Sequence, residues 1–118
     1  MRDPKIIKGY HAHIYYPDDE SRARAASIRE AILDRWEVRM GRWRDMPVGP
    51  HPIPMYQVAF DASLFEEIVP WLMLNRNGLT VLVHPETGDD VEDHDVNPLW
   101  LGRKLDLDID SLRRNAAG

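Results

Sequence analysis

Histidine is the residue type in this chain with the clearest capacity for metal binding and proton transfer. The sequence contains five histidines: His11, His13, His51, His84 and His94. Imidazole nitrogen suits Fe(II), Zn(II), Mn(II), Cu(II) and Ni(II), and two histidines with a carboxylate leave coordination positions open for substrate and oxygen. The chain has no cysteine, which excludes disulfides, thiolate zinc sites, iron–sulfur clusters and a cysteine nucleophile. The histidines are therefore the first candidates for a chemical site.

The pair His11 and His13 belongs to a segment that favours a β-strand. Residues 6–16 are rich in aromatic and β-branched side chains, and Pro17 follows them as a stop. Because strand side chains alternate, two histidines separated by one residue point to the same face. The alternate residues are more apolar and suit a face covered by helices: Tyr10, Ala12, Ile14 and Tyr16. We therefore expect the pair to look away from the helices.

The elements that position the other histidines begin with a helix and two strands. Asp18 and Asp19 can cap a helix that ends near Glu37. Its apolar stripe has spacings of three and four residues: Ala25, Ile28, Ile32 and Trp36. Residues 38–45 and 55–60 favour strands. The prolines between them, at positions 47, 50 and 52, predict a loop that contains His51.

The second half of the chain predicts another helix and two more strands. Asp61 or Ser63 can cap the helix, Pro70 should kink or restart it, and Asn77-Gly78 should close it. Residues 79–84 form a nearly all-apolar strand, 85–98 read as a loop, and 105–109 alternate like an edge strand.

The order β-α-β-β-α-β is typical of the ferredoxin-like, α+β class. It predicts a single domain over residues 1–118, with a four-stranded antiparallel sheet and two helices on one face. Small domains of this type pair through the other face into a dimeric α+β barrel, so we expect a homodimer. Ile7 and Leu82 should lie on the uncovered face that the second copy would bury.

This topology predicts where the histidines converge. With the strand order 4-1-3-2, we place the first strand between the fourth, antiparallel to it, and the third, parallel to it. His84 ends the fourth strand and His51 precedes the third, so both should lie beside the start of the first strand, near His11. His13 would lie one pleat further along, and His94 could fold back over the group. Such a gathering favours a metal site over isolated polar residues.

Other side chains are candidates for substrate binding. Arg42 and Arg44 share a face of the second expected strand and could hold a substrate carboxylate. Tyr56 is typical of a core aromatic whose hydroxyl reaches the rim, where it could also contact a substrate.

Composition excludes several classes of function. The net charge is −5, with 15 basic and 20 acidic side chains and no basic stripe, which argues against nucleic-acid binding. No apolar run is long enough for a membrane span, and the N-terminus lacks the apolar stretch of a signal peptide. The expected location is the cytoplasm.

Four short elements contain all five histidines, and their combination is specific. They are the His-x-His of residues 9–16, the Gly-Pro-His-Pro of 49–52, the His-Pro-Glu-Thr-Gly of 84–88, and Asp-His at 93–94 followed by Trp-Leu-Gly at 100–102. Together they resemble the DOPA 4,5-dioxygenase family of fungi and bacteria, over residues 9–112.

The resemblance implies extradiol cleavage of a catechol by O2 with a non-haem metal. Fe(II) is the expected ion, and Zn, Mn or another divalent metal could take its place. With DOPA the product would be a muconic semialdehyde, seco-DOPA, which cyclises to a betalain-type pigment precursor. The physiological catechol and the ring position that is cleaved stay open.

The resemblance also implies roles for the histidines. His11, His13 and His84 would be metal ligands, ahead of His51. His51 or His94 would take a catechol proton and return it later in the reaction. A carboxylate ligand and a three-histidine site are both possible, and three acids are within reach by sequence: Glu86, Asp89 and Asp93.

Two other functions remain open on the same architecture. One is a cofactor-free or haem-handling monooxygenase, which would leave the clustered histidines without a role. The other is a non-catalytic metal- or ligand-binding protein. Metal analysis and oxygen uptake with catechols separate the three possibilities.

Overall fold

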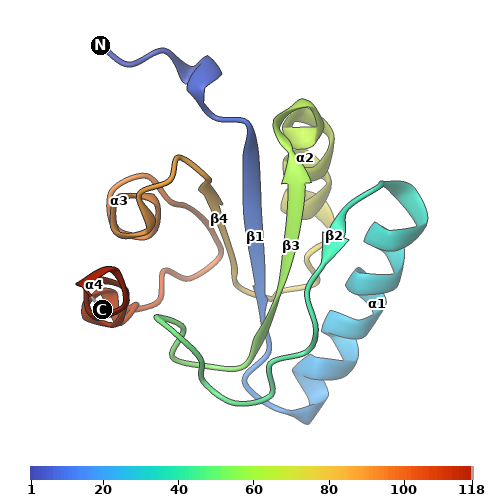
Figure 1. Cartoon of the computed structure of the whole chain (residues 1–118). Helices are drawn as coiled ribbons and strands as arrows, with labels where there is room; N and C mark the ends of the chain where they lie inside the picture. Colours follow the sequence, from blue (N-terminus) through green and yellow to red (C-terminus); the bar gives the residue numbers. More distant parts are fainter. Residues whose placement is uncertain (118) are drawn as a thin grey trace.

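The computed structural model describes residues 1–117 and has one antiparallel sheet at its centre (Figure 1). The strand order is β2-β3-β1-β4-β5. The strands are β1 (Gly9–Tyr15), β2 (Arg39–Met40), β3 (Met55–Asp61), β4 (Val81–Pro85) and β5 (Leu99–Leu101). The helices are α1 (Asp19–Arg35), α2 (Phe65–Asn75), α3 (Asp90–Asp95) and α4 (Ile109–Ala117), with 3-10 turns η1 (Pro4–Ile6) and η2 (Ala62–Leu64). The predicted α+β class is confirmed, with five strands in place of four.

Helices α1 and α2 lie on one side of the sheet, and α3 and α4 lie on the other (Figure 1). Helix α1 begins at a reciprocal cap in which the Asp18 carboxylate accepts a hydrogen bond from the Ser21 backbone N–H at 2.8 Å. Its stripe then buries Ala25, Ile28 and Ile32 against the sheet. This side holds the main apolar core of the molecule.

Helix α2 ends where the sequence predicts, but a 3-10 turn precedes its start. Asp61 caps the 3-10 turn η2, where its carboxylate accepts from the Ser63 backbone N–H at 2.9 Å, and α2 continues from Phe65. The helix runs through Pro70 to Asn75. It is closed by Asn77 and Gly78, which both have positive φ, as the Asn-Gly signal predicts.

The predicted parallel pairing of the first and third strands is wrong. β1 and β3 are antiparallel, with Gly9 opposite Asp61 and Tyr15 opposite Met55. The reason is chain direction: the helical crossover makes β2 run with β1, and the following return reverses β3. The start of β3 therefore lies beside the end of β1, which changes the position of His51.

Two other predicted segments also differ from the structure. The strand expected over 38–45 is reduced to Arg39–Met40, after which the segment stays beside β3 through the Gly41 N–H, which donates to the Gln57 carbonyl at 2.7 Å, and an isolated bridge between Arg44 and Met55. The segment 105–109 is not a strand. Leu105 and Leu107 alternate because they pack against the sheet face beside Leu82.

The second edge of the sheet is β5, a strand to which the sequence assigns no element. β5 pairs with β4 through Leu82 and Trp100, and the region expected to be loop, 85–98, also contains α3. Helix α3 has a clear cap, because the Asp89 carboxylate accepts from the Glu92 backbone N–H at 3.0 Å.

The sheet face opposite α1 and α2 is covered by the same chain. Leu82 is fully buried and packs in a second apolar cluster with Tyr15 and Met55, over which Trp100 lies. The apolar face that led us to expect a homodimer is therefore already buried within one protomer. Dimerisation stays a prediction, but burial of this face no longer supports it. In the described residues 1–117, no helix is long and apolar enough to cross a bilayer.

Candidate metal centre

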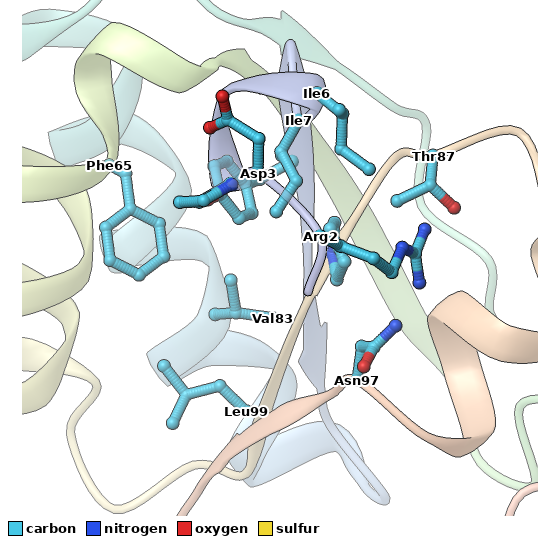
Figure 2. Close-up of a pocket in the computed structure, with 12 residues that line it drawn as sticks. Arg2, Asp3, Ile6, Ile7, Phe65, Val83, Thr87, Asn97 and Leu99 are labelled. Atoms are coloured by element: carbon cyan, nitrogen blue, oxygen red, sulfur yellow. The ribbon is translucent and has the colours of Figure 1, made fainter.

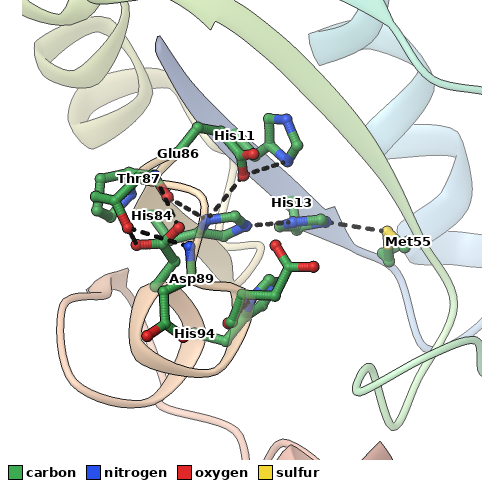
Figure 3. Close-up of polar contacts among 11 residues, drawn as sticks. His11, His13, Met55, His84, Glu86, Thr87, Asp89 and His94 are labelled. Carbon is green, nitrogen blue, oxygen red and sulfur yellow. Dashed lines mark hydrogen bonds and ion pairs between the residues drawn. The ribbon is translucent and has the colours of Figure 1, made fainter. Parts of the chain in front are cut away.

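Three histidines meet on the sheet face that α1 and α2 do not cover. His11 and His13 both project from β1 on this face, as the alternation predicts, and His84 of β4 lies directly opposite His11 in the ladder. The ring centroids of His11 and His84 are 5.2 Å apart, and those of His13 and His84 are 5.1 Å apart. His13 and His84 approach through their Nε2 atoms, at 3.0 Å (Figure 3).

The other two histidines complete one continuous cluster. The His51 ring centroid lies 4.2 Å from that of His13, and the His94 centroid lies 4.0 Å from that of His84. The five imidazoles are thus brought together, as the sequence predicts. The predicted position of His51 beside His11 is wrong, because antiparallel β3 carries His51 to the Tyr15 end of β1.

Helix α3 is the element that places His94 in the cluster. Asp93 is fully buried and accepts hydrogen bonds from the Thr87 backbone N–H at 2.9 Å and from the Thr87 hydroxyl at 2.6 Å. These bonds tie α3 to the turn after β4. His94 follows Asp93 and is held by a contact between its Nδ1 and the Asp90 carbonyl oxygen at 2.7 Å.

Two of the histidines use Nδ1 as a hydrogen-bond donor. The acceptors are the Pro85 carbonyl for His84 at 3.0 Å and the Asp90 carbonyl for His94. Nδ1 of His11 lies 3.2 Å from the Glu86 carboxylate, as a charge contact. A neutral ring that donates from Nδ1 has a free lone pair on Nε2, which is the form in which an imidazole binds a metal. The network therefore prepares the Nε2 atoms of His84 and His94 as ligands, and the Glu86 carboxylate lies beside the ring of His11.

His13 can join them through a change of tautomer. In this structure it donates its Nε2–H to the bare Nε2 of His84. With its hydrogen on Nδ1, which lies 3.4 Å from the sulfur of Met55, it would instead leave two Nε2 lone pairs facing each other. Two nitrogens that bind one metal at about 2.1 Å and at a right angle are about 3.0 Å apart, which is the spacing found.

These residues fit a divalent metal in two overlapping ways. The ligand atoms of His11, His13 and His84 lie within 4.8 Å of one another, and so do those of His13, His51 and His94. Among the three candidate acids, only Glu86 lies against the histidines, with its carboxylate 3.2 Å from His11 and 3.6 Å from His84. Asp89 caps α3 and Asp93 holds Thr87, so both are already engaged.

Burial keeps the central imidazoles neutral. It lowers the pKa of His51 to about 4 and that of His84 to about 3, with the neighbouring His94 adding to both effects. Burial also holds the pKa of His13 well below its usual value, and lowers the pKa of His11 to a smaller extent. Neutral imidazole is the form that coordinates a metal, so the cluster is ready to bind one at neutral pH.

A hollow of about 240 Å³ leads to this cluster. His13 and His51 line its inner part, and Arg42, Arg44 and Gln57 line the rest of its polar wall. Both arginines are exposed and make no ion pair within residues 1–117. The sequence analysis named the arginines and missed Gln57, which alternation from Met55 would have placed on the same face.

Tyr56 does not reach the hollow. It is fully buried on the opposite side of the sheet, where its hydroxyl donates to the Ala25 carbonyl of α1 at 2.7 Å. The prediction that Tyr56 contacts substrate is therefore corrected: neighbouring residues on β3 face opposite ways, and Tyr56 belongs to the core with Ile14 and Val58.

Tyr15 is the site residue that the sequence analysis overlooked. It is buried, and its hydroxyl lies 2.7 Å from Nδ1 of His51. The signal was present, because Tyr15 continues the spacing of His11 and His13 on the same strand face.

A separate hollow of about 390 Å³ lies on the other side of the sheet (Figure 2). Its walls include Ile7, Phe65 and Val83, and Arg2 at its rim is ion-paired with Glu92. No histidine lines it, so it offers no ligand set comparable to the cluster.

An α+β domain with a buried group of neutral imidazoles beside a polar hollow has the features of a metal-dependent enzyme. The sequence matches the Dopa 4,5-dioxygenase family over residues 10–111, and the chain belongs to this family of dioxygenases.

Two curated relatives and one solved structure are similar to this chain, and the names of two of these three include a dioxygenase. A 21.2 kDa uncharacterised protein of Botryotinia fuckeliana is 33% identical over 95% of this chain, and a DOPA 4,5-dioxygenase of Amanita muscaria is 30% identical over 90% of it. The chain spans 67% and 50% of the lengths of these relatives. A crystal structure from Nostoc punctiforme, described as that of a proposed dioxygenase, is 56% identical with a TM-score of 0.95, over 98% of this chain and 99% of its own.

Proposed function

We propose that this protein is an extradiol dioxygenase that opens the ring of a catechol with O2, using Fe(II) held by His11, His13 and His84. The observation that carries the proposal is the buried cluster in which the Nε2 atoms of His13 and His84 meet at 3.0 Å beside an open hollow. Membership of a dioxygenase family supports the reaction class.

The metal has a definite chemical task in this proposal. Bound Fe(II) would supply the redox-active centre that the reaction of triplet O2 with a singlet catechol requires. Both atoms of O2 enter the product and one ring C–C bond beside the diol is broken, so no external reductant is needed. Zn(II) and Mn(II) fit the same imidazole donors, but zinc has no redox chemistry.

The chain's own residues orient the ligands and move protons. Glu86 lies 3.2 Å from His11 and 3.6 Å from His84, so its carboxylate adds negative charge beside both rings. His94 presents a bare Nε2 and is the group able to accept a catechol proton. Burial of the cluster limits the access of water to the reacting atoms.

The arginines favour a catechol that carries a carboxylate. Arg42 and Arg44 line the hollow that His13 and His51 also line, and neither has an ion-pair partner within residues 1–117. Paired guanidinium groups suit a carboxylate, since their planar N–H donors match its two oxygens. The amino-acid side chain of DOPA has such a group, which makes DOPA a suitable first substrate.

We also propose that the protein is located in the cytoplasm. A reducing compartment such as the cytoplasm keeps iron ferrous, and the absence of cysteine places no requirement for an oxidising one.

Anaerobic loading with metal followed by oxygen uptake tests this function. The metal-free protein is loaded with Fe(II), Zn(II) or Mn(II) and is given DOPA, 3,4-dihydroxyphenylacetate or 4-methylcatechol. We expect oxygen consumption and a yellow semialdehyde with Fe(II), and none with Zn(II). Iron-loaded protein that consumes no oxygen with any catechol would favour a non-catalytic binding protein, and product that contains one oxygen atom from O2 would favour a monooxygenase.

A further inference from the structure

The contact between Tyr15 and His51 distinguishes His51 from the other histidines. The Tyr15 hydroxyl lies 2.7 Å from Nδ1 of His51, and both side chains are buried, with exposed fractions of 1% and 5%. In three other rings the group beside Nδ1 is an acceptor, either a carboxylate or a carbonyl oxygen. These are the rings of His11, His84 and His94. Among the histidines of the described residues, only His51 meets a group at Nδ1 that can donate to it.

The direction of this hydrogen bond follows from the hydrogen-bonding needs of Tyr15. Within residues 1–117, the Tyr15 hydroxyl has no other hydrogen-bond partner. If His51 donated from Nδ1, the buried hydroxyl hydrogen would have no acceptor, which is costly. A phenol hydroxyl carries its hydrogen at neutral pH and can donate it. Tyr15 therefore donates and Nδ1 of His51 accepts.

This direction determines the chemistry of the opposite nitrogen of His51. A neutral imidazole that accepts at Nδ1 has its hydrogen on Nε2. Nε2 of His51 has no hydrogen-bond partner in the described part of the chain, and the ring lines the hollow with His13 and the two arginines. The ring thus presents an N–H donor where His84 and His94 present lone pairs.

We propose that Tyr15 is a positioning residue that fixes His51 in its Nε2–H tautomer, so that His51 acts as a hydrogen-bond donor to the oxygen atoms of a bound substrate and not as a metal ligand. The assignment of the tautomer stands on the structure alone, and its catalytic consequence rests on the proposed function. Of the two overlapping groups of histidines, the proposal favours the one without His51 as the metal ligands: His11, His13 and His84.

Nitrogen NMR on the metal-free protein tests the tautomer directly. The protein is labelled with 15N-histidine, and long-range 1H–15N spectra are recorded near pH 7.5, with the His51 signals identified by their absence in His51→Gln. We expect a protonated Nε2 and a bare Nδ1 for His51. In Tyr15→Phe, which removes only the hydroxyl, we expect a measurable population of the Nδ1–H tautomer.

Tyr16→Phe is the matched control. Its hydroxyl donates to the Asp45 carboxylate at 3.0 Å on the other side of the sheet, so the His51 signals should be unchanged. A protonated Nδ1 of His51 in the wild-type protein would overturn the proposal, and so would a tautomer that is unchanged in Tyr15→Phe.

The catalytic consequence has its own measurement. In iron-loaded Tyr15→Phe we expect a normal iron content and a kcat reduced about tenfold, the size expected for loss of one oriented hydrogen bond. Loss of iron from Tyr15→Phe or His51→Gln would show that His51 is a ligand and would overturn the assignment. A kcat equal to that of the wild type would overturn the donor role. A wild-type protein that has the expected tautomer but cleaves no catechol would contradict the proposed function alone.

Discussion

The two faces of strand β1 are built from alternate residues of one short segment, yet they serve different purposes. Ala12 and Ile14 face α1 and α2 and are fully buried in an apolar core. His11 and His13 face the other way, among polar and titratable side chains. Adjacent positions in the sequence thus separate stability from chemistry by the pleat of a single strand.

The layers that cover the two faces also differ. The apolar face is covered by α1 and α2, which pack continuous stripes of side chains against it. The histidine face is covered by the short helix α3, the proline-containing loop 46–54 and the extended segment 102–108. Irregular segments leave hollows between them, and one hollow of about 240 Å³ reaches His13 and His51. Chemistry is therefore concentrated where the covering is least regular.

The largest effect should come from removing a central imidazole. His84→Ala takes away the fully buried ring whose Nε2 faces that of His13. We expect loss of bound iron and at least a thousandfold loss of catechol cleavage, because the metal would lose a ligand and its partner ring would lose its direction. Metal analysis and oxygen uptake measure both effects. Turnover that persists in His84→Ala would show that the ligand set is wrong.

A substitution of Ile14, the residue next to His13, should lower stability and leave iron binding unchanged. Ile14→Ala leaves a cavity in the apolar core, so we expect the free energy of unfolding to fall by about 2–5 kcal/mol. The iron content of the folded protein should stay unchanged, since the side chain faces α1 and α2. Urea unfolding and metal analysis test the separation of the two faces, and Ile14→Val should lose only about 1 kcal/mol. Loss of iron from folded Ile14→Ala would contradict it.

Acid should destabilise the metal-free protein through the histidine face. Burial lowers the pKa of His51 to about 4, so between its unfolded value near 6.5 and pH 4 the unfolded chain binds more protons than the folded one. The contribution of His51 to the free energy of unfolding is complete above pH 6.5. It falls by roughly 3 kcal/mol as the pH decreases.

Urea unfolding at pH 7.5 and pH 4.5, with a chelator present, measures this loss. His51→Gln is the control, and its stability should fall less over the same range because the carboxylates still titrate but this imidazole does not. An equal pH dependence in the two proteins would contradict the assignment to His51.

The smallest effect should concern substrate choice. Arg42→Gln and Arg44→Gln remove charge at the mouth of the hollow, where neither arginine has an ion-pair partner in residues 1–117. We expect KM for DOPA to rise about tenfold in each, in the range of a lost charge-assisted hydrogen bond, with little change for 4-methylcatechol. Steady-state oxygen uptake with both catechols measures the ratio. Equal changes for the two substrates would place carboxylate binding elsewhere.

Much of the site could be predicted from the local pattern. The face of His11 and His13 follows from strand alternation, and the helix stripe of Ile28 and Ile32 follows from its spacing. The loop that carries His51 follows from its prolines. Tyr15 could have been found by the same alternation, because it lies on the same strand as His11 and His13.

The errors concern relations between distant segments. Alternation gives the face of Tyr56 only relative to its neighbours, and the pairing of β3 with β1 decides that Tyr56 faces Ala25 in the core. The alternating leucines of 105–109 have the same pattern in an edge strand as in an extended segment that packs on a sheet. A local pattern contains no information on which of these surroundings applies.

The sequence by itself determined the residue types of the site, the face of β1 on which they lie and the class of the fold, because propensity and alternation depend on near neighbours in the chain. The tertiary structure alone decided that His51 lies at the Tyr15 end of β1, that His94 reaches His84 through α3, and that Glu86 is the adjoining acid. Those relations depend on strand direction and on the packing of segments far apart in sequence. They arise only when the whole chain satisfies its burial and hydrogen bonds together.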